Sequence, residues 1–137
     1  MAENEHTTRT FVSLIVRGKD LNPQMVTDSI GIFPSRFFKR GDIRKDSKKW
    51  PHGYWELEST GFVQSSDLAL HLEWMAAKLE PSKTALRMLL NNEDLNTELS
   101  CFWILPTGND NLSLSPELLN RIASLGLKLS FDIYCAD

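Results

Sequence analysis

The sequence of 137 residues is poor in cysteine and has no apolar stretch long enough to cross a membrane. Cys101 and Cys135 are too few for a disulfide framework and are not spaced as CxxC. Apolar runs such as Leu99–Leu105 are far shorter than the roughly 20 residues of a membrane-spanning helix. The N-terminal residues also lack the apolar segment of a signal peptide. We therefore expect a protein of the reducing cytoplasm that has no membrane partner.

Motifs for phosphate or metal binding are absent as well. The seven glycines are scattered singly, without the GxxxxGK or GxGxxG spacing of nucleotide-binding loops. The three histidines, His6, His52 and His71, lie far apart and do not form an HExxH-type pair. We therefore expect no cofactor, no metal site and no enzymatic activity.

The remaining candidates for catalysis have simple structural explanations. Cys101 and Cys135 fall in register with the inward residues of their expected strands, where a buried thiol is inert. His71 follows Asp67 by four residues on an expected helix, so we expect the two side chains to bond at the edge of the core. Glu56 and Glu58 share one face of an expected strand, which is typical of a solvated face.

Hydrophobic periodicity predicts alternating strands and helices along most of the chain. Strands are expected at Thr10–Arg17, from Ile32 onward, and at Tyr54–Glu58, Thr97–Leu105 and Leu127–Cys135. The last of these alternates cleanly, which predicts that Leu129, Phe131, Ile133 and Cys135 point inward. Helices are expected after Asn22, at Asp67–Leu79 with Ser65 or Ser66 as its cap, at Lys83–Leu90, and after Ser115.

Two of these helices begin and end with similar residues. The segments LNPQMVTDSIGI (21–32) and LSPELLNRIASLGL (114–127) each place a capping residue and proline before an apolar helix and glycine after it. They are either a weak internal repeat or one common solution used twice. The element order predicts an α+β two-layer sandwich with a mainly antiparallel sheet and helices on one face, built as two β-α-β halves around a central helix pair. We assign residues 9–137 to this single domain and residues 1–8 to a disordered N-terminus.

Charge is distributed unevenly along the chain. The net charge is −3, yet the segment from Arg36 to Lys49 contains seven basic residues and only two acidic ones, so it carries +5 and the remainder −8. Aromatic residues are interleaved with and follow this basic segment, including Phe37, Phe38 and Trp50. Three interpretations remain open: a solvated loop anchored by buried rings, a surface for a protein partner, or a surface for nucleic acid.

The acidic remainder of the chain would repel a polyanion, which makes nucleic acid the least favoured of the three. Trp, Tyr and Arg are the residues that dominate the energetics of protein interfaces. We therefore hypothesise a binding surface for an acidic protein partner, formed by Arg36, Lys39, Arg40, Arg44, Lys45, Trp50, His52 and Tyr54.

A series of short motifs occurs in a characteristic order along the chain: Ile30-Gly31-Ile32, Pro34-Ser35, Lys39-Arg40-Gly41-Asp42, Gly53, Trp55-Glu56-Leu57 and Leu79-Glu80-Pro81. Through these motifs the chain resembles, over about residues 9–134, a bacterial family called domain of unknown function 4279. It implies a small bacterial cytosolic α+β protein and brings no activity with it. The matching positions Gly31, Pro34, Gly41, Gly53 and Trp55 are as readily structural as functional.

We expect a non-enzymatic protein-interaction module, with neutralisation of a bacterial toxin as one form that this function takes in proteins of similar size and type. The alternative is a domain that binds a small ligand or an anion, or an enzyme without a familiar motif, using the region from Arg36 to Trp55. A concave pocket joining His52 to Arg36 or Arg40 would favour the alternative, and a flat or convex patch would favour the interaction module.

Overall fold

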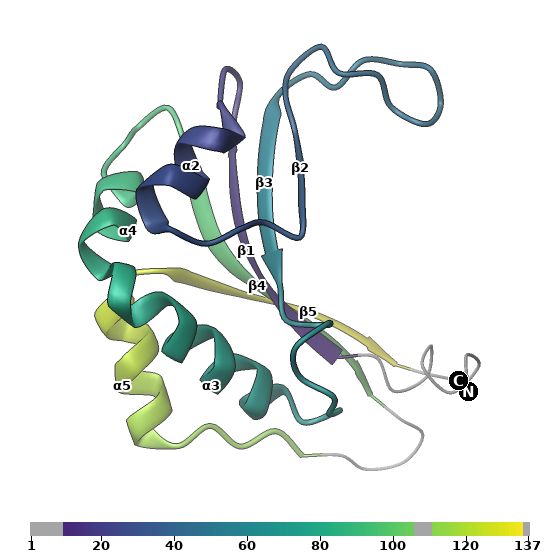
Figure 1. Ribbon diagram of the computed structural model, residues 1–137. Helices are drawn as coiled ribbons and strands as arrows, with labels where there is room; N and C mark the ends of the chain where they lie inside the picture. The colour runs from purple at the N-terminus through teal and green to yellow at the C-terminus, as the bar shows by residue number, and fades with distance from the viewer. Residues whose placement is uncertain (1–9, 106–110, 136–137) are drawn as a thin grey trace.

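A computed structural model describes residues 10–105 and 111–135; the N-terminus expected to be disordered lies outside this part of the chain. Helices cover one face of a five-stranded sheet (Figure 1), which confirms the predicted α+β two-layer fold. A short 3-10 turn, Glu80–Ser82, joins the central helix pair. The elements are β1 (Thr10–Gly18), α2 (Pro23–Ile30), β2 (Arg36–Phe38), β3 (Gly53–Glu58), α3 (Leu68–Leu79), α4 (Lys83–Leu90), β4 (Asn96–Leu105), α5 (Pro116–Leu125) and β5 (Lys128–Cys135).

The strand order in the sheet is β2-β3-β1-β4-β5. Neighbours run antiparallel except β4 and β5, which are parallel and joined through α5. In the first β-α-β half, β3 lies between the two strands that α2 connects, whereas in the second half the two strands are direct neighbours. The halves therefore share a helix motif but arrange their strands differently.

The residues that bound α2 and α5 act as the sequence predicts. The side chain of Asn22 accepts a hydrogen bond from the Gln24 amide, and that of Ser115 accepts one from the Leu118 amide. Gly31 and Gly126 end the helices with φ of 72° and 76°, a left-handed conformation that costs glycine little.

The prediction that Ser65 or Ser66 caps the longest helix is wrong. Asp67 is the N-cap of α3, because its extended backbone aims the carboxylate at the Ala69 amide, 3.0 Å away. Ser65 instead accepts a hydrogen bond from the Asp67 amide and so supports the turn that precedes the helix.

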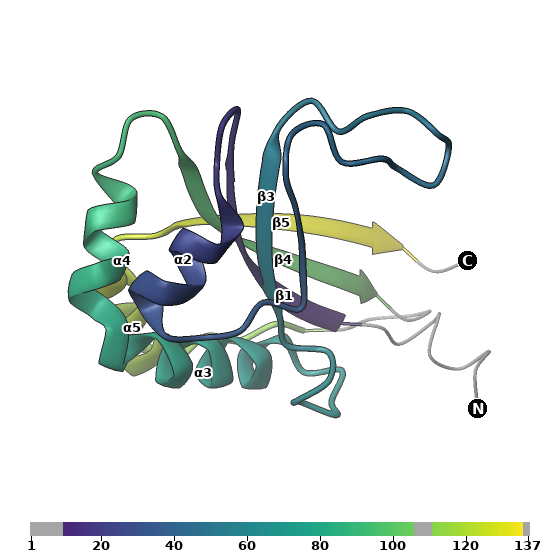
Figure 2. The ribbon, with the colours of Figure 1, turned by 45° about the horizontal axis from the view of Figure 1, so that its top comes forward.

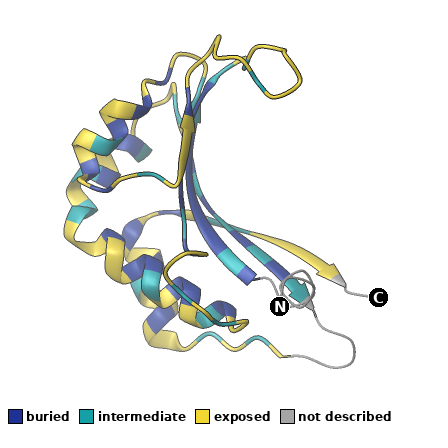
Figure 3. Cartoon of the chain, turned by 45° about the vertical axis from the view of Figure 1, so that its right-hand side comes forward, coloured by how far each residue is buried: buried dark blue, intermediate teal, exposed yellow. Residues whose placement is uncertain are grey.

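The main core lies between the sheet and the helix layer (Figure 3). Its largest fully buried side chains come from β1, β3, β4, α3 and α4, among them Leu14, Trp55, Leu72, Met75 and Leu99. The inward positions alternate along each strand, because successive side chains point to opposite faces of a sheet.

The opposite face of the sheet carries no helix and is curved (Figure 3). A second, small cluster lies on this uncovered face: Ile15, Phe38 and Tyr54 are buried, and Trp50 packs against them. Trp50 belongs to the long connection between β2 and β3, so this cluster ties that connection to the sheet.

The prediction that Phe131 and Ile133 point into the core is wrong in part. Their register with Cys101 and Trp103 places them on the helix-covered side of the sheet, but they are 43% and 50% exposed. The end of β5 extends past the helices (Figure 2), so the helix layer does not complete the burial of these two side chains. The inward prediction for Cys135 lies outside the described side chains.

Cys101 is fully buried, and burial raises the pKa of its thiol to about 12. A thiol reagent attacks the thiolate, which is scarce at pH 8 when the pKa is this high. We therefore expect that a Cys135→Ser variant, in which Cys101 is the remaining thiol, reacts with a thiol reagent only after unfolding. Absorbance of the released thiolate follows the reaction, and rapid labelling of the native protein would contradict the buried position.

Candidate functional site

The basic segment forms a folded hairpin between β2 and β3, not a slack loop. Residues 39–52 project beyond the sheet and away from the helices (Figures 1 and 2). The amide of Gly41 donates to the carbonyl of Trp50 at 2.9 Å, and the amide of Trp50 donates to the carbonyl of Asp42 at 2.9 Å. Nearer the tip, the amide of Arg44 donates to the carbonyl of Lys48 at 2.7 Å. We refer to residues 39–52 as the basic hairpin.

Three aromatic rings anchor the base of the basic hairpin to the uncovered face. Phe38 lies between Trp50 and Tyr54, with ring centroids 3.7 Å and 4.9 Å away and interplanar angles of 11° and 6°. His52 meets the Phe38 ring edge-on at 5.9 Å. Aromatic pairs in such arrangements contribute about 0.5–1.5 kcal/mol beyond their buried area. The stack therefore limits how far the hairpin can move relative to the sheet.

Arginine side chains lie over two of the stacked rings. Arg44 lies over the Trp50 ring at 4.9 Å, while Arg36 and Arg17 lie over the Tyr54 ring at 5.3 Å and 5.7 Å. Such cation–π contacts contribute about 0.5–1 kcal/mol at exposed sites.

Ion pairs use the same arginines. Arg44 also pairs with Asp46 at 3.1 Å, and Arg40 pairs with Asp20, in the turn after β1, at 2.7 Å. The arginines of the hypothesised surface thus help to build the hairpin.

The lysines of the segment behave differently. Lys39, Lys45, Lys48 and Lys49 are exposed, and the ion pairs within residues 10–105 and 111–135 do not include them. The two acidic residues of the hairpin are otherwise engaged, because Asp46 pairs with Arg44 and Asp42 accepts from the Lys39 amide at 2.8 Å. Ile43 is 74% exposed among these lysines. The hairpin therefore presents positive charge and the apolar side chain of Ile43 to solvent.

The expectation that Glu56 lies on a solvated face is wrong. Glu56 is only 6% exposed, although its face of the sheet has no helix over it. Its carboxylate accepts hydrogen bonds from the hydroxyls of Ser13 at 2.6 Å and Tyr54 at 2.9 Å, and pairs with Arg36 at 3.3 Å. Neighbouring strands bring these groups together, since β3 lies between β1 and β2.

The network shifts the pKa values of its members. A side-chain hydrogen bond with Tyr54, and then the charge of Glu56, raise the pKa of Arg36 above its ordinary value. Burial is the main reason that the pKa of Tyr54 is raised. Both groups therefore keep their protons at neutral pH: the guanidinium carries a positive charge and the phenol donates to Glu56.

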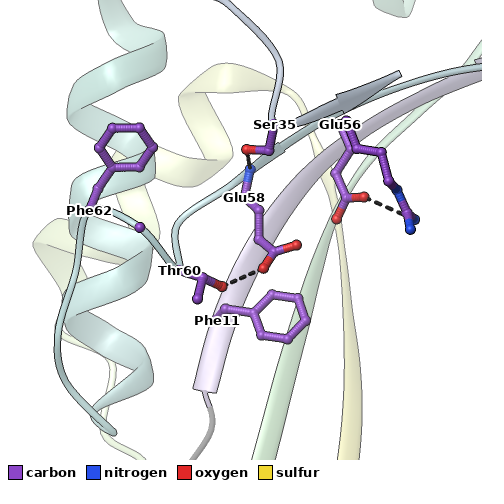
Figure 4. Close-up of a pocket in the computed structure, with 8 residues that line it drawn as sticks. Phe11, Ser35, Glu56, Glu58, Thr60 and Phe62 are labelled. Atoms are coloured by element: carbon purple, nitrogen blue, oxygen red, sulfur yellow. Dashed lines mark hydrogen bonds and ion pairs between the residues drawn. The ribbon is translucent and has the colours of Figure 1, made fainter. Parts of the chain in front are cut away.

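A cleft of about 570 Å³ lies on the uncovered face at the far end of β3 from the hairpin (Figure 4). Phe11 and Phe62 form two walls, and Glu56, Glu58 and Arg36 supply the charge. The hydroxyl of Thr60 donates to the Glu58 carboxylate, and the Glu58 amide donates to the Ser35 hydroxyl.

Of the hypothesised binding residues, Arg36 is the one that lines this cleft, and neither His52 nor Arg40 does. The cleft therefore does not join the hypothesised residues into one pocket. Its two carboxylates outnumber its single guanidinium, which does not favour an anion.

His71 and Ser59 form a buried pair that sequence reasoning missed. His71 was expected to bond to Asp67, but it is 1% exposed and its Nδ1 lies 2.7 Å from the Ser59 hydroxyl. Its Nε2 lies 2.7 Å from the Ser65 carbonyl oxygen, which can only accept, so Nε2 is the donor in this bond; in the neutral tautomer with the proton on Nε2, Nδ1 accepts from the Ser59 hydroxyl. The Ser59 hydroxyl accepts in turn from the Val12 amide. Because Ser59 is fully buried, the pair links β1, β3 and α3 instead of meeting a substrate.

Two further expectations concern metals and membranes. Within the described ranges, no group of three or more potential His, Cys, Asp or Glu ligands gathers in a way that would hold a metal ion. No helix in the same part of the chain has the length and hydropathy needed to span a bilayer.

Several positions that carry the family resemblance have a structural explanation. Trp55 is fully buried, and Gly31 is the left-handed cap of α2. At Gly53 a side chain would overlap the carbonyl oxygen of Leu21, which crosses close to the start of β3.

The similarity of this chain to known proteins lies at the level of a protein family. No curated protein matches the chain. No solved structure matches it either. A family model described as a domain of unknown function, DUF4279, matches residues 6–136, and the chain therefore belongs to this family.

Proposed function

We propose that this protein is a non-enzymatic interaction module whose basic hairpin docks on an acidic surface of a partner protein. One observation carries the proposal: the hairpin is anchored by the Trp50–Phe38–Tyr54 stack, while four of its lysines lack ion pairs within the described chain. Anchored charge favours binding, because less conformational freedom is lost when the partner docks.

The arrangement of charge supports an acidic partner. Like charges on neighbouring residues repel one another. Exposed charges contribute little to the stability of the fold, so stability does not explain why the lysines are clustered. A cluster does accelerate the encounter with an oppositely charged surface. The exposed Ile43 adds an apolar contact at the centre of this charge, which suits a protein surface better than a phosphate backbone.

The alternative role, binding of a small ligand or an anion, has weaker support. The cleft of about 570 Å³ includes Arg36 but not the rest of the basic hairpin, and its carboxylates disfavour anions. The thiol of Cys101 and the Ser59–His71 pair are buried, which supports a role without nucleophilic catalysis. We place this role in the cytoplasm, the compartment that sparse cysteine favours, and include toxin neutralisation among its possible forms.

The proposal predicts that the four lysines control binding to acidic polypeptides. In a variant with Lys39, Lys45, Lys48 and Lys49 replaced by Gln, we expect the Kd for polyglutamate to rise about tenfold or more, mainly through slower association. The melting temperature should stay nearly unchanged, because exposed charges contribute about 0–1 kcal/mol. Stopped-flow binding of labelled polyglutamate at several salt concentrations measures both the rate and its salt dependence.

A matched control replaces Lys19, Lys78, Lys83 and Arg87 by Gln, which also removes four positive charges from the chain but takes them from outside the hairpin. It should bind polyglutamate nearly as the wild type does. If both variants lost affinity for polyglutamate equally, the net charge of the chain would explain the effect and the proposal would be wrong. Tighter binding of single-stranded DNA than of polyglutamate, with the same dependence on the hairpin lysines, would favour nucleic acid over a protein partner.

A further inference from the structure

We propose that β5 is a dimerisation edge, on which a second copy of this chain adds its own β5 antiparallel to form one ten-stranded sheet. Three features point to this occupant: an open edge, exposed apolar side chains, and charges that complement each other when the strand meets a copy of itself. The inference does not depend on the basic hairpin, which lies at the other end of the sheet.

The outer edge of β5 is available for pairing. β5 pairs with β4 on one side, and no described strand lies on its other side. The strand runs from Lys128 to Cys135 without proline, so the backbone groups along its outer edge are able to join a ladder. The opposite edge strand, β2, is only three residues long, and short edge strands resist pairing.

Three large apolar or aromatic side chains of β5 are more exposed than is usual for residues of their kind. Phe131, Ile133 and Tyr134 are 43%, 50% and 51% exposed. Figure 2 shows this end of β5 extending past the helix layer. Long exposed apolar edge strands are templates for pairing with another chain. A second strand beside β5 would cover part of the Phe131 side chain.

Symmetry restricts the register of such a pair. If the helix layers of both copies lie on the same side, residues that face each other must occupy the same face of the joint sheet. Lys128, Ser130 and Asp132 are on the uncovered face, in register with Glu98, Ser100 and Phe102 of β4. Leu129 and Phe131 are on the helix-covered face, in register with Leu99 and Cys101. The two-fold axis must therefore pass through a residue pair.

Centring the axis on Ser130 places Lys128 of each copy opposite Asp132 of the other. Because the interface is two-fold, this ion pair occurs twice. The same register places Leu129 opposite Phe131 on the helix-covered face, again twice. Opposite charges and apolar pairs across neighbouring strands both stabilise a sheet. The alternation of charge along KLSFD, residues 128–132, is thus complementary to itself.

Charge reversal tests both the interface and its register. In sedimentation velocity over a concentration series, we expect the full-length chain to show a reversible dimer. Asp132→Lys or Lys128→Asp alone should raise the dimer Kd about tenfold or more, because each creates two like-charge pairs. The double variant K128D/D132K restores both pairs and should return the Kd to within about threefold of the wild type.

Lys78→Asp, an exposed reversal in α3, is the control for net charge and should leave the Kd unchanged. Circular dichroism of each variant checks that the monomer remains folded, since Lys128 lies opposite Glu98 on β4. A chain that stays monomeric up to about 1 mM would overturn the proposal. A dimer that both single reversals leave intact, or that the double variant fails to restore, would assign the interface to another surface or register.

Discussion

Trp55→Ala is expected to lower the free energy of unfolding by about 3–5 kcal/mol, as the truncation of large buried aromatic side chains does. Trp55 is fully buried on the helix-covered face of β3, and its Nε1 donates to the Thr27 hydroxyl of α2 at 3.0 Å. The substitution leaves a cavity and also removes this link between the sheet and the first helix. Urea denaturation followed by circular dichroism measures the loss.

The free energy of unfolding of a domain of this size is typically about 5–15 kcal/mol, so the expected loss is large enough to prevent the alanine variant from folding. Trp55→Phe keeps most of the ring volume and removes the donor; we expect it to fold and to cost about 1–2 kcal/mol. A loss below about 1 kcal/mol for the alanine variant would show that the ring is not part of the core.

The second large effect is expected at Glu56. Glu56→Ala should cost about 2–4 kcal/mol, because the hydroxyls of Ser13 and Tyr54 lose their shared acceptor in a buried position. Ser13 is 1% exposed and Tyr54 is 8% exposed, so water replaces the carboxylate poorly. Equilibrium unfolding in urea gives the free energy.

Glu56→Gln separates the hydrogen bonds from the charge. The amide oxygen still accepts from Tyr54, whereas the ion pair with Arg36 is lost. The Arg36 side chain is 66% exposed, so solvent screens the pair and we expect a loss of only about 0.5–1.5 kcal/mol. Equal losses in the two variants would mean that the ion pair, not the hydrogen-bond network, stabilises this face.

The boundaries of α2 and α5 were predictable because their signals are local. Asn22 and Ser115 cap their helices through contacts within three residues, and Gly31 and Gly126 end them through their own backbone conformation. Alternation along β3 and β4 likewise predicted which side chains face the helix layer. The two-layer α+β fold follows from the order of these elements, since amphipathic helices between strands must cover a sheet face.

The candidate site was predictable in part. Composition identified the cationic segment and its aromatic neighbours, but it did not distinguish the arginines that build the hairpin from the lysines that remain without ion pairs. Arg40 pairs with Asp20, and Arg17 lies over the Tyr54 ring. Asp20 and Arg17 both precede α2 and lie far from the basic segment in the sequence. Contacts between distant residues depend on how strands are ordered in the sheet.

Burial on either side of the sheet was decided only by the tertiary structure. Alternation assigns Glu56 and Phe131 to a face, but it does not say what covers that face. Glu56 is buried because hydroxyls from two strands and an arginine from a third surround it, while Phe131 is exposed because the helix layer ends before it. His71 likewise bonds to Ser59 of the chain after β3 instead of the nearer Asp67, whose carboxylate caps α3. Hydrophobic periodicity and helix capping are determined by residues close together in the sequence. Burial depends instead on which distant surfaces the completed fold brings together.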